Sequence, residues 1–194
     1  MKKITGIILA GGKSSRMGTD KALIEVNGKK IIQHIFEALN NVTDSVMIIS
    51  NSNNADFLGV SVYTDLIEDC GPLGGIYTGL KFSETEKNII LSCDIPFVTA
   101  ELLNFLIEKS EKHDVAIPEH NGKTEPLCGV YSKSCEQVFK NSLTSGNHKL
   151  HDAINLLNLN IVNIDKEKFY NNKLLANLNT LEELKKYTEL NHDN

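Results

Sequence analysis

The chain has 194 residues, of which 41% are hydrophobic and 23% are charged, as in a globular protein with one sizeable core. Its 25 acidic and 20 basic residues give a net charge of −5, which argues against a general nucleic-acid-binding protein because such proteins carry a basic excess. No apolar run reaches transmembrane length, and the run at 7–10 is too short for a signal peptide. We therefore expect one cytoplasmic domain spanning 1–194, with neither nucleic acid nor membrane as a partner.

The apolar pattern predicts strands that alternate with helices along most of the chain. Strands are expected at 4–9, 46–50, 60–63, 88–92, 115–118, 127–131 and 161–164. Helices are expected at 30–40, 73–82, 99–109, 132–142, 149–157 and 180–190. Asn27-Gly28 is typical of a tight turn, Thr99 of a helix N-cap, and Thr180 to Glu183 of a capping box. The alternation predicts an α/β fold with a mostly parallel sheet covered by helices on both faces.

Four cysteines are present: Cys70, Cys93, Cys128 and Cys135. No pair has C-x-x-C spacing, and an even count is weak support for disulfides in a chain of this size. We expect reduced thiols that serve as small buried apolar side chains.

Ligands of parallel sheets bind beyond the carboxyl ends of the strands. Three predicted loops lie at that edge: 10–21, 65–75 and 93–97. In the first loop, Gly11-Gly12 lets backbone N–H groups turn toward a phosphate. Three cations follow, Lys13, Arg16 and Lys21. A triphosphate needs both the backbone N–H donors and the cations, so this loop is a candidate triphosphate site. The alternative is a basic surface loop. The spacing of the glycines and lysine fits neither a Walker P-loop nor a G-x-G-x-x-G fingerprint.

Two aspartates stand at the same predicted edge. Asp94 follows a buried strand, a position suited to Mg²⁺, which prefers one or two carboxylates together with phosphate oxygens and water. Asp65 follows another strand and is a second acidic candidate. The alternatives are a helix or turn cap for Asp94 and a turn residue for Asp65.

Five motifs together resemble the molybdenum cofactor guanylyltransferase (MobA) family of the nucleotidyltransferase superfamily. Segment 9–21, LAGG-x-S-x-RMG-x-DK, resembles the superfamily signature. The others are NGK at 27–29 followed by QH at 33–34, GPLGGI at 71–76, CDIP at 93–96, and N-x-NT-x-EEL at 177–184. One departure is Leu181, where the family has proline. The resemblance extends from the first predicted strand to the last predicted helix.

The resemblance implies a Rossmann-like nucleotidyltransferase fold and transfer of GMP from GTP to the terminal phosphate of Mo-molybdopterin, with release of pyrophosphate. The implied cofactor is Mg²⁺, held by Asp94. The GTP-binding residues expected are Leu9, Ala10, Gly11, Gly12, Lys21, Asn51, Asp65 and Asp94. Asn51 has a strand cap as its alternative role. The expected catalytic residues are Arg16 and Lys21, which would neutralise pyrophosphate, and Asp94.

The acceptor site is expected to include Asn177, Asn179 and Lys149. The resemblance also implies that Glu125-Pro126-Leu127 and the turn at 146–149 lie where the family approaches the pterin. Turn formation is the alternative role of both asparagines, and Lys149 stands near a position where the family often has arginine. His148 and His151 are three residues apart, as in some metal sites, but we expect them to be ordinary surface histidines. The resemblance also suggests contact with the molybdenum-insertion protein and with apo-molybdoenzymes.

Two alternative functions remain open at this point. One is a nucleotidyltransferase with another base or acceptor, such as a molybdopterin cytidylyltransferase or a sugar-phosphate enzyme. The other is a non-catalytic nucleotide-binding module on the same fold. Gly71-Pro72-Leu73 favours the guanylyl branch, and the presence of Arg16, Lys21 and Asp94 argues against a non-catalytic protein.

Overall fold

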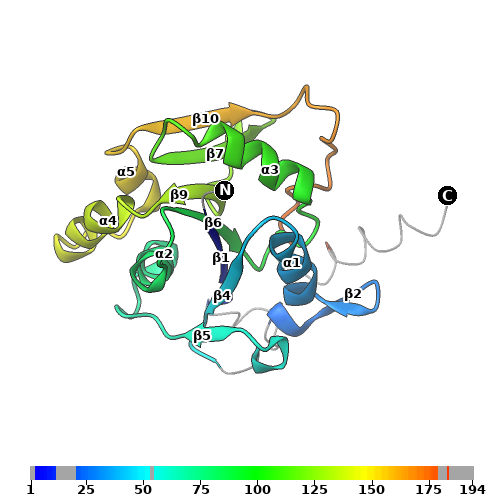
Figure 1. Ribbon diagram of the computed structural model, residues 1–194, viewed down its shortest axis with the longest axis horizontal. Helices are drawn as coiled ribbons and strands as arrows, with labels where there is room; N and C mark the ends of the chain where they lie inside the picture. The colour runs from blue at the N-terminus through cyan, green and yellow to red at the C-terminus, as the bar shows by residue number, and fades with distance from the viewer. Residues whose placement is uncertain (1–2, 12–20, 53–54, 179–182, 184–194) are drawn as a thin grey trace.

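One sheet forms the centre of the computed structural model, which describes residues 3–11, 21–52, 55–178 and 183 (Figure 1). Its strand order is β10-β7-β9-β6-β1-β4-β5, and β8 pairs with β7 outside this path. The strands are β1 Ile4–Leu9, β4 Ser45–Ile49, β5 Ser61–Tyr63, β6 Lys87–Ser92, β7 Val115–His120, β8 Lys123–Thr124, β9 Cys128–Ser132 and β10 Leu159–Asn163. Every strand expected from the sequence is present, and β8 is an addition.

The sheet is parallel except at β8 and β9. Strand β1 pairs in parallel with β4 and β6, and β7 pairs in parallel with β10. Strand β9 is antiparallel to both of its neighbours, β6 and β7. The chain at 121–127 is too short for the crossover of about a dozen residues that a parallel connection needs, so β9 must return in the opposite direction. The prediction of a mostly parallel sheet is therefore confirmed.

Helices cover both faces of the sheet and define two cores. They are α1 Ile31–Asn40, α2 Gly71–Phe82, α3 Ala100–Lys109, α4 Cys135–Thr144 and α5 Leu150–Ile154. Because side chains alternate along a strand, Ile8 packs into the core under α1 and α3, whereas Ile7 and Leu9 pack into the core under α2, α4 and α5. No helix within the described ranges is long and apolar enough to cross a membrane.

Local sequence signals explain several element boundaries. Asn27 and Gly28 have φ values of 52° and 77°, the left-handed conformation that a tight hairpin turn requires, and they join β2 Glu25–Val26 to β3 Lys29–Lys30. The Thr99 hydroxyl accepts a hydrogen bond from Leu102 N at 3.4 Å and caps α3, as expected.

Other boundaries differ from the predictions by a few residues. Helix α2 begins at Gly71 instead of 73, because Pro72 is favourable in the first helical turn. Helices α4 and α5 cover 135–144 and 150–154 instead of 132–142 and 149–157. Of the helix expected at 180–190, the structure describes Glu183, which is helical; the rest lies outside the described residues. All four cysteines are buried and free, as predicted.

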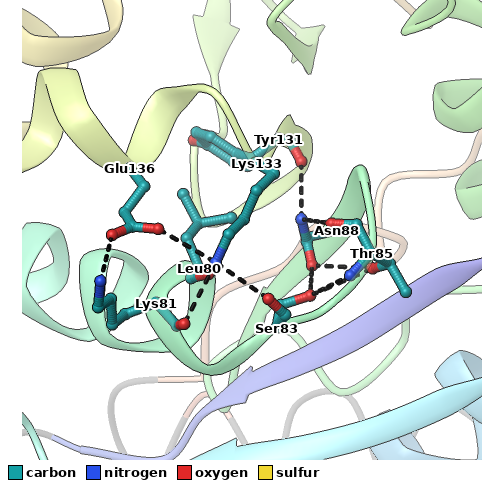
Figure 2. Close-up of polar contacts among 8 residues, drawn as sticks. All are labelled: Leu80, Lys81, Ser83, Thr85, Asn88, Tyr131, Lys133 and Glu136. Atoms are coloured by element: carbon teal, nitrogen blue, oxygen red, sulfur yellow. Dashed lines mark hydrogen bonds and ion pairs between the residues drawn. The ribbon is translucent and has the colours of Figure 1, made fainter.

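Lys133 fixes the carboxyl end of α2 (Figure 2). Its Nζ donates to the carbonyl of Leu80, and to those of Lys81 and Ser83 at 3.2 and 3.0 Å. Glu136 lies 3.1 Å from the ammonium groups of both Lys81 and Lys133. A cation is favourable at a helix carboxyl end, where carbonyl groups lack partners within the helix. These hydrogen bonds hold the carboxyl end of α2 to the β9–α4 connection. The amino end of α2 faces the candidate site.

Candidate functional site

A cavity of about 590 Å³ lies at the carboxyl ends of the parallel strands. Its walls come from the ends of β1, β4 and β6, the segment after β5, the first residues of α2 and the segment before β9. The lining residues are Leu9, Gly11, Ile49, Asn51, Asp65, Asp69, Gly71, Pro72, Gly75, Ser92 and Leu127. This is the edge at which the sequence predicts ligand binding, and the volume is in the usual range for small-molecule sites.

Backbone hydrogen bonds hold the start of the first loop between two strands. Ala10 N donates to Ile49 O at 2.9 Å, and Leu9 O accepts from Cys93 N at 3.2 Å. Leu9 and Gly11 line the cavity on either side of Ala10. Three predicted site residues lie outside the described residues. They are Gly12 and Arg16 of the motif at 9–21, and Asn179 of the motif at 177–184.

Asn51 and Asp65 form one end of the cavity. The Asn51 side chain accepts from Asp65 N at 3.1 Å and donates to Asp65 Oδ2 at 3.5 Å. The other oxygen, Asp65 Oδ1, is buried and has no hydrogen-bond partner among the described residues. Burial raises the pKa of Asp65, and the hydrogen bond from Asn51 opposes this effect. A buried acceptor without a donor is costly, so this oxygen is suited to an N–H or O–H group of a ligand.

Gly75 leaves space beside that carboxylate. A Cβ at position 75 would lie 3.2 Å from Leu9 Cδ2 and 3.6 Å from Asp65 Oδ1. Glycine in the first turns of α2 thus leaves room between β1 and Asp65. The GPLGG motif therefore shapes the cavity as well as starting the helix.

Lys21 and Asp94 form a charged pair at the end of β6. Lys21 Nζ lies 3.8 Å from Asp94 Oδ2, and the two side chains are 15% and 30% exposed. Ser92, which lines the cavity, donates its hydroxyl to Asp94 Oδ1. Burial lowers the pKa of Lys21, and the negative charge of Asp94 opposes this shift. The pair places one cation and one anion beside the cavity in a partly desolvated position.

Asp94 fits a magnesium ion only in the presence of a phosphate ligand. The described residues contain no group of three or more His, Cys, Asp or Glu side chains that could hold a metal by themselves. Mg²⁺ is bound in many phosphate sites by one or two carboxylates, with the remaining oxygens supplied by substrate and water. A single partly exposed carboxylate beside the cavity matches that donor set.

The predicted acceptor residues lie on two sides of the cavity. Asn177 is exposed and precedes Leu178, whose N donates to Asp94 O at 2.9 Å, so this part of the chain adjoins the Asp94 loop. Lys149 precedes α5 and follows His148, whose Nε2 lies 3.6 Å from Cys70 Sγ at the start of α2. No metal-binding group that includes His148 and His151 occurs in the described ranges.

Seven residues of the cavity wall were not among the individually predicted site residues. Asp69, Gly71, Pro72 and Gly75 lie in the predicted loop at 65–75, Leu127 lies in the segment 125–127 that the resemblance assigns to the acceptor side, and Ile49 and Ser92 lie outside these segments. Ile49 and Ser92 are the last residues of parallel strands, and a systematic reading of strand ends would have found both. Leu127 precedes the antiparallel strand β9, whose start lies at the edge where the parallel strands end. Its place depends on strand direction, which apolar spacing does not encode.

A mostly parallel sheet with this cavity at its carboxyl edge is the architecture of α/β proteins that bind small ligands, nucleotides among them, at the ends of their strands. The MobA-like NTP transferase domain matches residues 6–159. The probable molybdenum cofactor guanylyltransferase of Flavobacterium johnsoniae is 40% identical, covering 95% of this chain and 96% of that protein. The probable molybdenum cofactor guanylyltransferase of Carboxydothermus hydrogenoformans is 37% identical over 93% and 92%. The chain belongs to the MobA-like NTP transferase family.

The fold has a counterpart among solved structures. The molybdopterin-guanine dinucleotide biosynthesis protein A of Archaeoglobus fulgidus superimposes with a TM-score of 0.80 over 98% of this chain and 100% of that one. The two sequences are 24% identical, so the comparison establishes the shared fold. The expected nucleotidyltransferase fold is confirmed.

Proposed function

We propose that this protein transfers GMP from GTP to the terminal phosphate of Mo-molybdopterin, giving the guanine dinucleotide form of the cofactor and pyrophosphate. The names of the relatives, which match over almost their whole length, support this reaction. The observation that carries the proposal is the Lys21–Asp94 pair, 3.8 Å apart, beside a cavity at the carboxyl edge of the sheet. It combines a cation for phosphate charge with a carboxylate for a metal ion.

The guanine base belongs at the Asp65 end of the cavity in this proposal. Guanine presents a ring N–H and an amino group side by side, and a carboxylate can accept from both. Asp65 offers a buried oxygen without a partner among the described residues, and Asn51 holds the carboxylate in place. Uracil has a ring N–H without an adjacent amino group, and adenine and cytosine lack a ring N–H beside their amino groups, so they match this acceptor less well.

Positioning and charge neutralisation account for the chemistry. An oxygen of the acceptor phosphate forms a bond to the α-phosphorus of GTP, and the bond from that phosphorus to the α–β bridging oxygen breaks, so that pyrophosphate leaves. We assign Lys21 and Arg16 to the phosphate groups, and Leu9 to Gly12 to backbone contacts with the nucleotide. Mg²⁺, when held by Asp94 and phosphate oxygens, supplies further neutralisation of the phosphate charge. Ser92 orients the Asp94 carboxylate through its hydroxyl group.

We assign Asn177 and Lys149, which lie on two sides of the cavity, to contacts with the acceptor, as the family resemblance implies. We also propose, on that resemblance, that the enzyme acts in the cytoplasm and contacts the molybdenum-insertion protein and apo-molybdoenzymes. Co-purification with either class of protein is the direct measurement for these partners.

Thermal unfolding with nucleotides tests the donor half of the proposal. At a GTP concentration of about 100 Kd, binding stabilises the folded state by about 2.7 kcal/mol, a rise in Tm of about 5–10 °C for a chain of this size. We expect that rise with GTP and Mg²⁺, a smaller one for Asp94→Asn, and an unchanged one for Glu101→Gln, a control at the start of α3. A larger rise with CTP would indicate a cytidylyltransferase, and no rise with any nucleotide would exclude the proposed donor site.

Release of pyrophosphate tests the reaction itself. Wild-type protein with GTP, Mg²⁺ and Mo-molybdopterin is expected to release one pyrophosphate for each dinucleotide formed. Nucleotide binding without this release would indicate a non-catalytic module.

A further inference from the structure

Strand β10 forms one margin of the sheet, and in the described part of the chain its outer edge pairs with no other strand. Figure 1 shows it along the upper border of the molecule, with no other labelled element beyond it. Such an edge presents N–H and C=O groups to a further strand, and proteins usually protect it with lysine, proline or a short length. The opposite margin is protected by length, because β5 has three residues, whereas β10 has five.

The sequence of β10 carries no protective residue. The strand reads LNIVN, without a charge or a proline. Ile161, at its centre, is 48% exposed, and Leu156, three residues before the strand, is 71% exposed. An uncharged edge beside exposed apolar side chains is suited to contact with another protein strand.

The hydrogen bonds between β10 and β7 show which residues of β10 face the open edge. Asn158 O and Ile164 N both bond to the β7 side, at 3.3 and 3.0 Å. The register between the two strands is continuous, and successive residues of a strand direct their N–H and C=O groups to opposite sides. Three residues therefore direct these groups outward: Leu159, Ile161 and Asn163.

We propose that two copies of this chain associate through β10, as antiparallel strands with a twofold axis at Ile161. The inference goes beyond the proposed function and does not depend on it. A register centred on Ile161 lets all five residues of each strand overlap. Each outward-facing residue then stands opposite an outward-facing residue of the second copy, which gives about six backbone hydrogen bonds.

The edge is complementary to itself in this register. Ile161 meets its counterpart on one face of the sheet, and directly opposite β-branched apolar side chains stabilise an antiparallel pair. Leu159 stands opposite Asn163 of the second copy, so no like charges are opposed. On the other face, Val162 is buried in its own core, and Asn160 Nδ2 donates to a carbonyl of α3 at 3.0 Å. These two side chains therefore need no partner from the second copy.

Association through β10 leaves the cavity of each copy open. The cavity wall extends along the sheet as far as Leu127, at the start of β9, and both β7 and β10 lie beyond that strand. Because the paired strands run in opposite directions, the carboxyl edges of the two sheets also point in opposite directions. The two cavities then lie on opposite sides of the dimer, and each copy can bind its own nucleotide.

The dimer should be weak, because two five-residue strands meet over only about 17 Å, at the small end of specific interfaces. We expect a dissociation constant on the order of 10 μM. In analytical ultracentrifugation between about 1 and about 500 μM, the average mass should rise from the 21.5 kDa monomer toward twice that value. Wild-type protein that stays monomeric at about 500 μM would overturn the proposal.

Ile161→Lys tests the surface. It places two ammonium groups opposite each other at the axis, and we expect the dissociation constant to rise at least about tenfold. Ser61→Lys is the matched control, an exposed position on β5 at the other margin of the sheet, and should leave the dimer unchanged. The Tm without nucleotide reports whether each variant folds, independently of the proposed function. A dimer that survives Ile161→Lys, or is lost in Ser61→Lys, contradicts pairing through β10.

Cysteine cross-linking tests the register, with wild type as the background because its four cysteines are buried. Ile161→Cys places the two Cα atoms about 5.5 Å apart across the axis, whereas Leu159→Cys or Asn163→Cys alone separates them by about 14 Å. A bismaleimide with a reach between these spacings should link Ile161→Cys. It should also link a mixture of the Leu159→Cys and Asn163→Cys proteins, but neither of them alone. Equal linking of all three variants, or none with Ile161→Cys, would refute the proposed pairing.

Discussion

Gly79 lies where α2 crosses β1, and a methyl group there should destabilise the protein. A Cβ at position 79 would lie 2.6 Å from Ile7 Cγ2 and 3.0 Å from Ile7 Cδ1, whereas favourable carbon contacts lie at about 3.5–4.0 Å. Ile7 is fully buried on a central strand, so it has little freedom to move. Overpacking costs about 1–3 kcal/mol, and alanine returns about 1 kcal/mol through its higher helix propensity. We therefore expect Gly79→Ala to lower the free energy of unfolding by up to about 2 kcal/mol.

Urea denaturation of a double-mutant cycle tests this explanation. Ile7→Ala removes the atoms that the new methyl group would meet and by itself should cost about 2–5 kcal/mol. In the double variant the methyl group fills part of the space left by Ile7, so the combined loss should be at least about 1 kcal/mol smaller than the sum. Ile7→Val retains Cγ2 and should relieve Gly79→Ala much less. Additivity in the Ile7→Ala cycle would refute the clash as the cause.

Three further predictions concern charged residues. Lys21→Ala should lower turnover at saturating GTP about a hundredfold or more, and near-normal turnover would contradict its role at the phosphates. Asp65→Asn should raise the Tm at pH 7 but weaken GTP binding. Burial raises the pKa of Asp65 above 3.8, so the charged carboxylate disfavours folding and its replacement by a neutral amide removes that cost. The gain in Tm should vanish as the pH falls below 3.8, where the carboxyl group is protonated in both the folded and the unfolded chain. Lys133→Met should lower the free energy of unfolding by about 1–2 kcal/mol in urea, since the α2 carbonyls and Glu136 lose their cation; an unchanged value would show that water replaces the contact.

The fold was largely predictable because its signals are local. Alternating strands and helices, the Asn27-Gly28 turn and the Thr99 cap each depend on a few neighbouring residues, and the structure confirms them. Helix ends were less accurate, as at α5, because packing against the second core decides where a short helix stops. Strand β8 was missed because it is two residues long and forms only by pairing with β7.

The site was predicted where a motif marks it and missed where tertiary structure creates it. Lys21, Asp65 and Asp94 follow recognisable motifs or strand ends, and the structure places them around one edge of the sheet. Leu127 was expected at the acceptor side through the resemblance alone, because its place depends on β9 running against its neighbours, which the lengths of apolar runs do not reveal.

The hydrogen bond from Leu178 N to Asp94 O has a consequence for biosynthesis. The Asp94 loop leaves the ribosome well before Leu178 is added, and at about 5–20 residues per second the delay is on the order of 10 s. During that interval a nascent chain can form the strands that flank the first loop but lacks the segment that closes over the Asp94 carbonyl. Premature termination before this residue would therefore yield a chain that can form these strands but lacks the hydrogen bond to the Asp94 carbonyl.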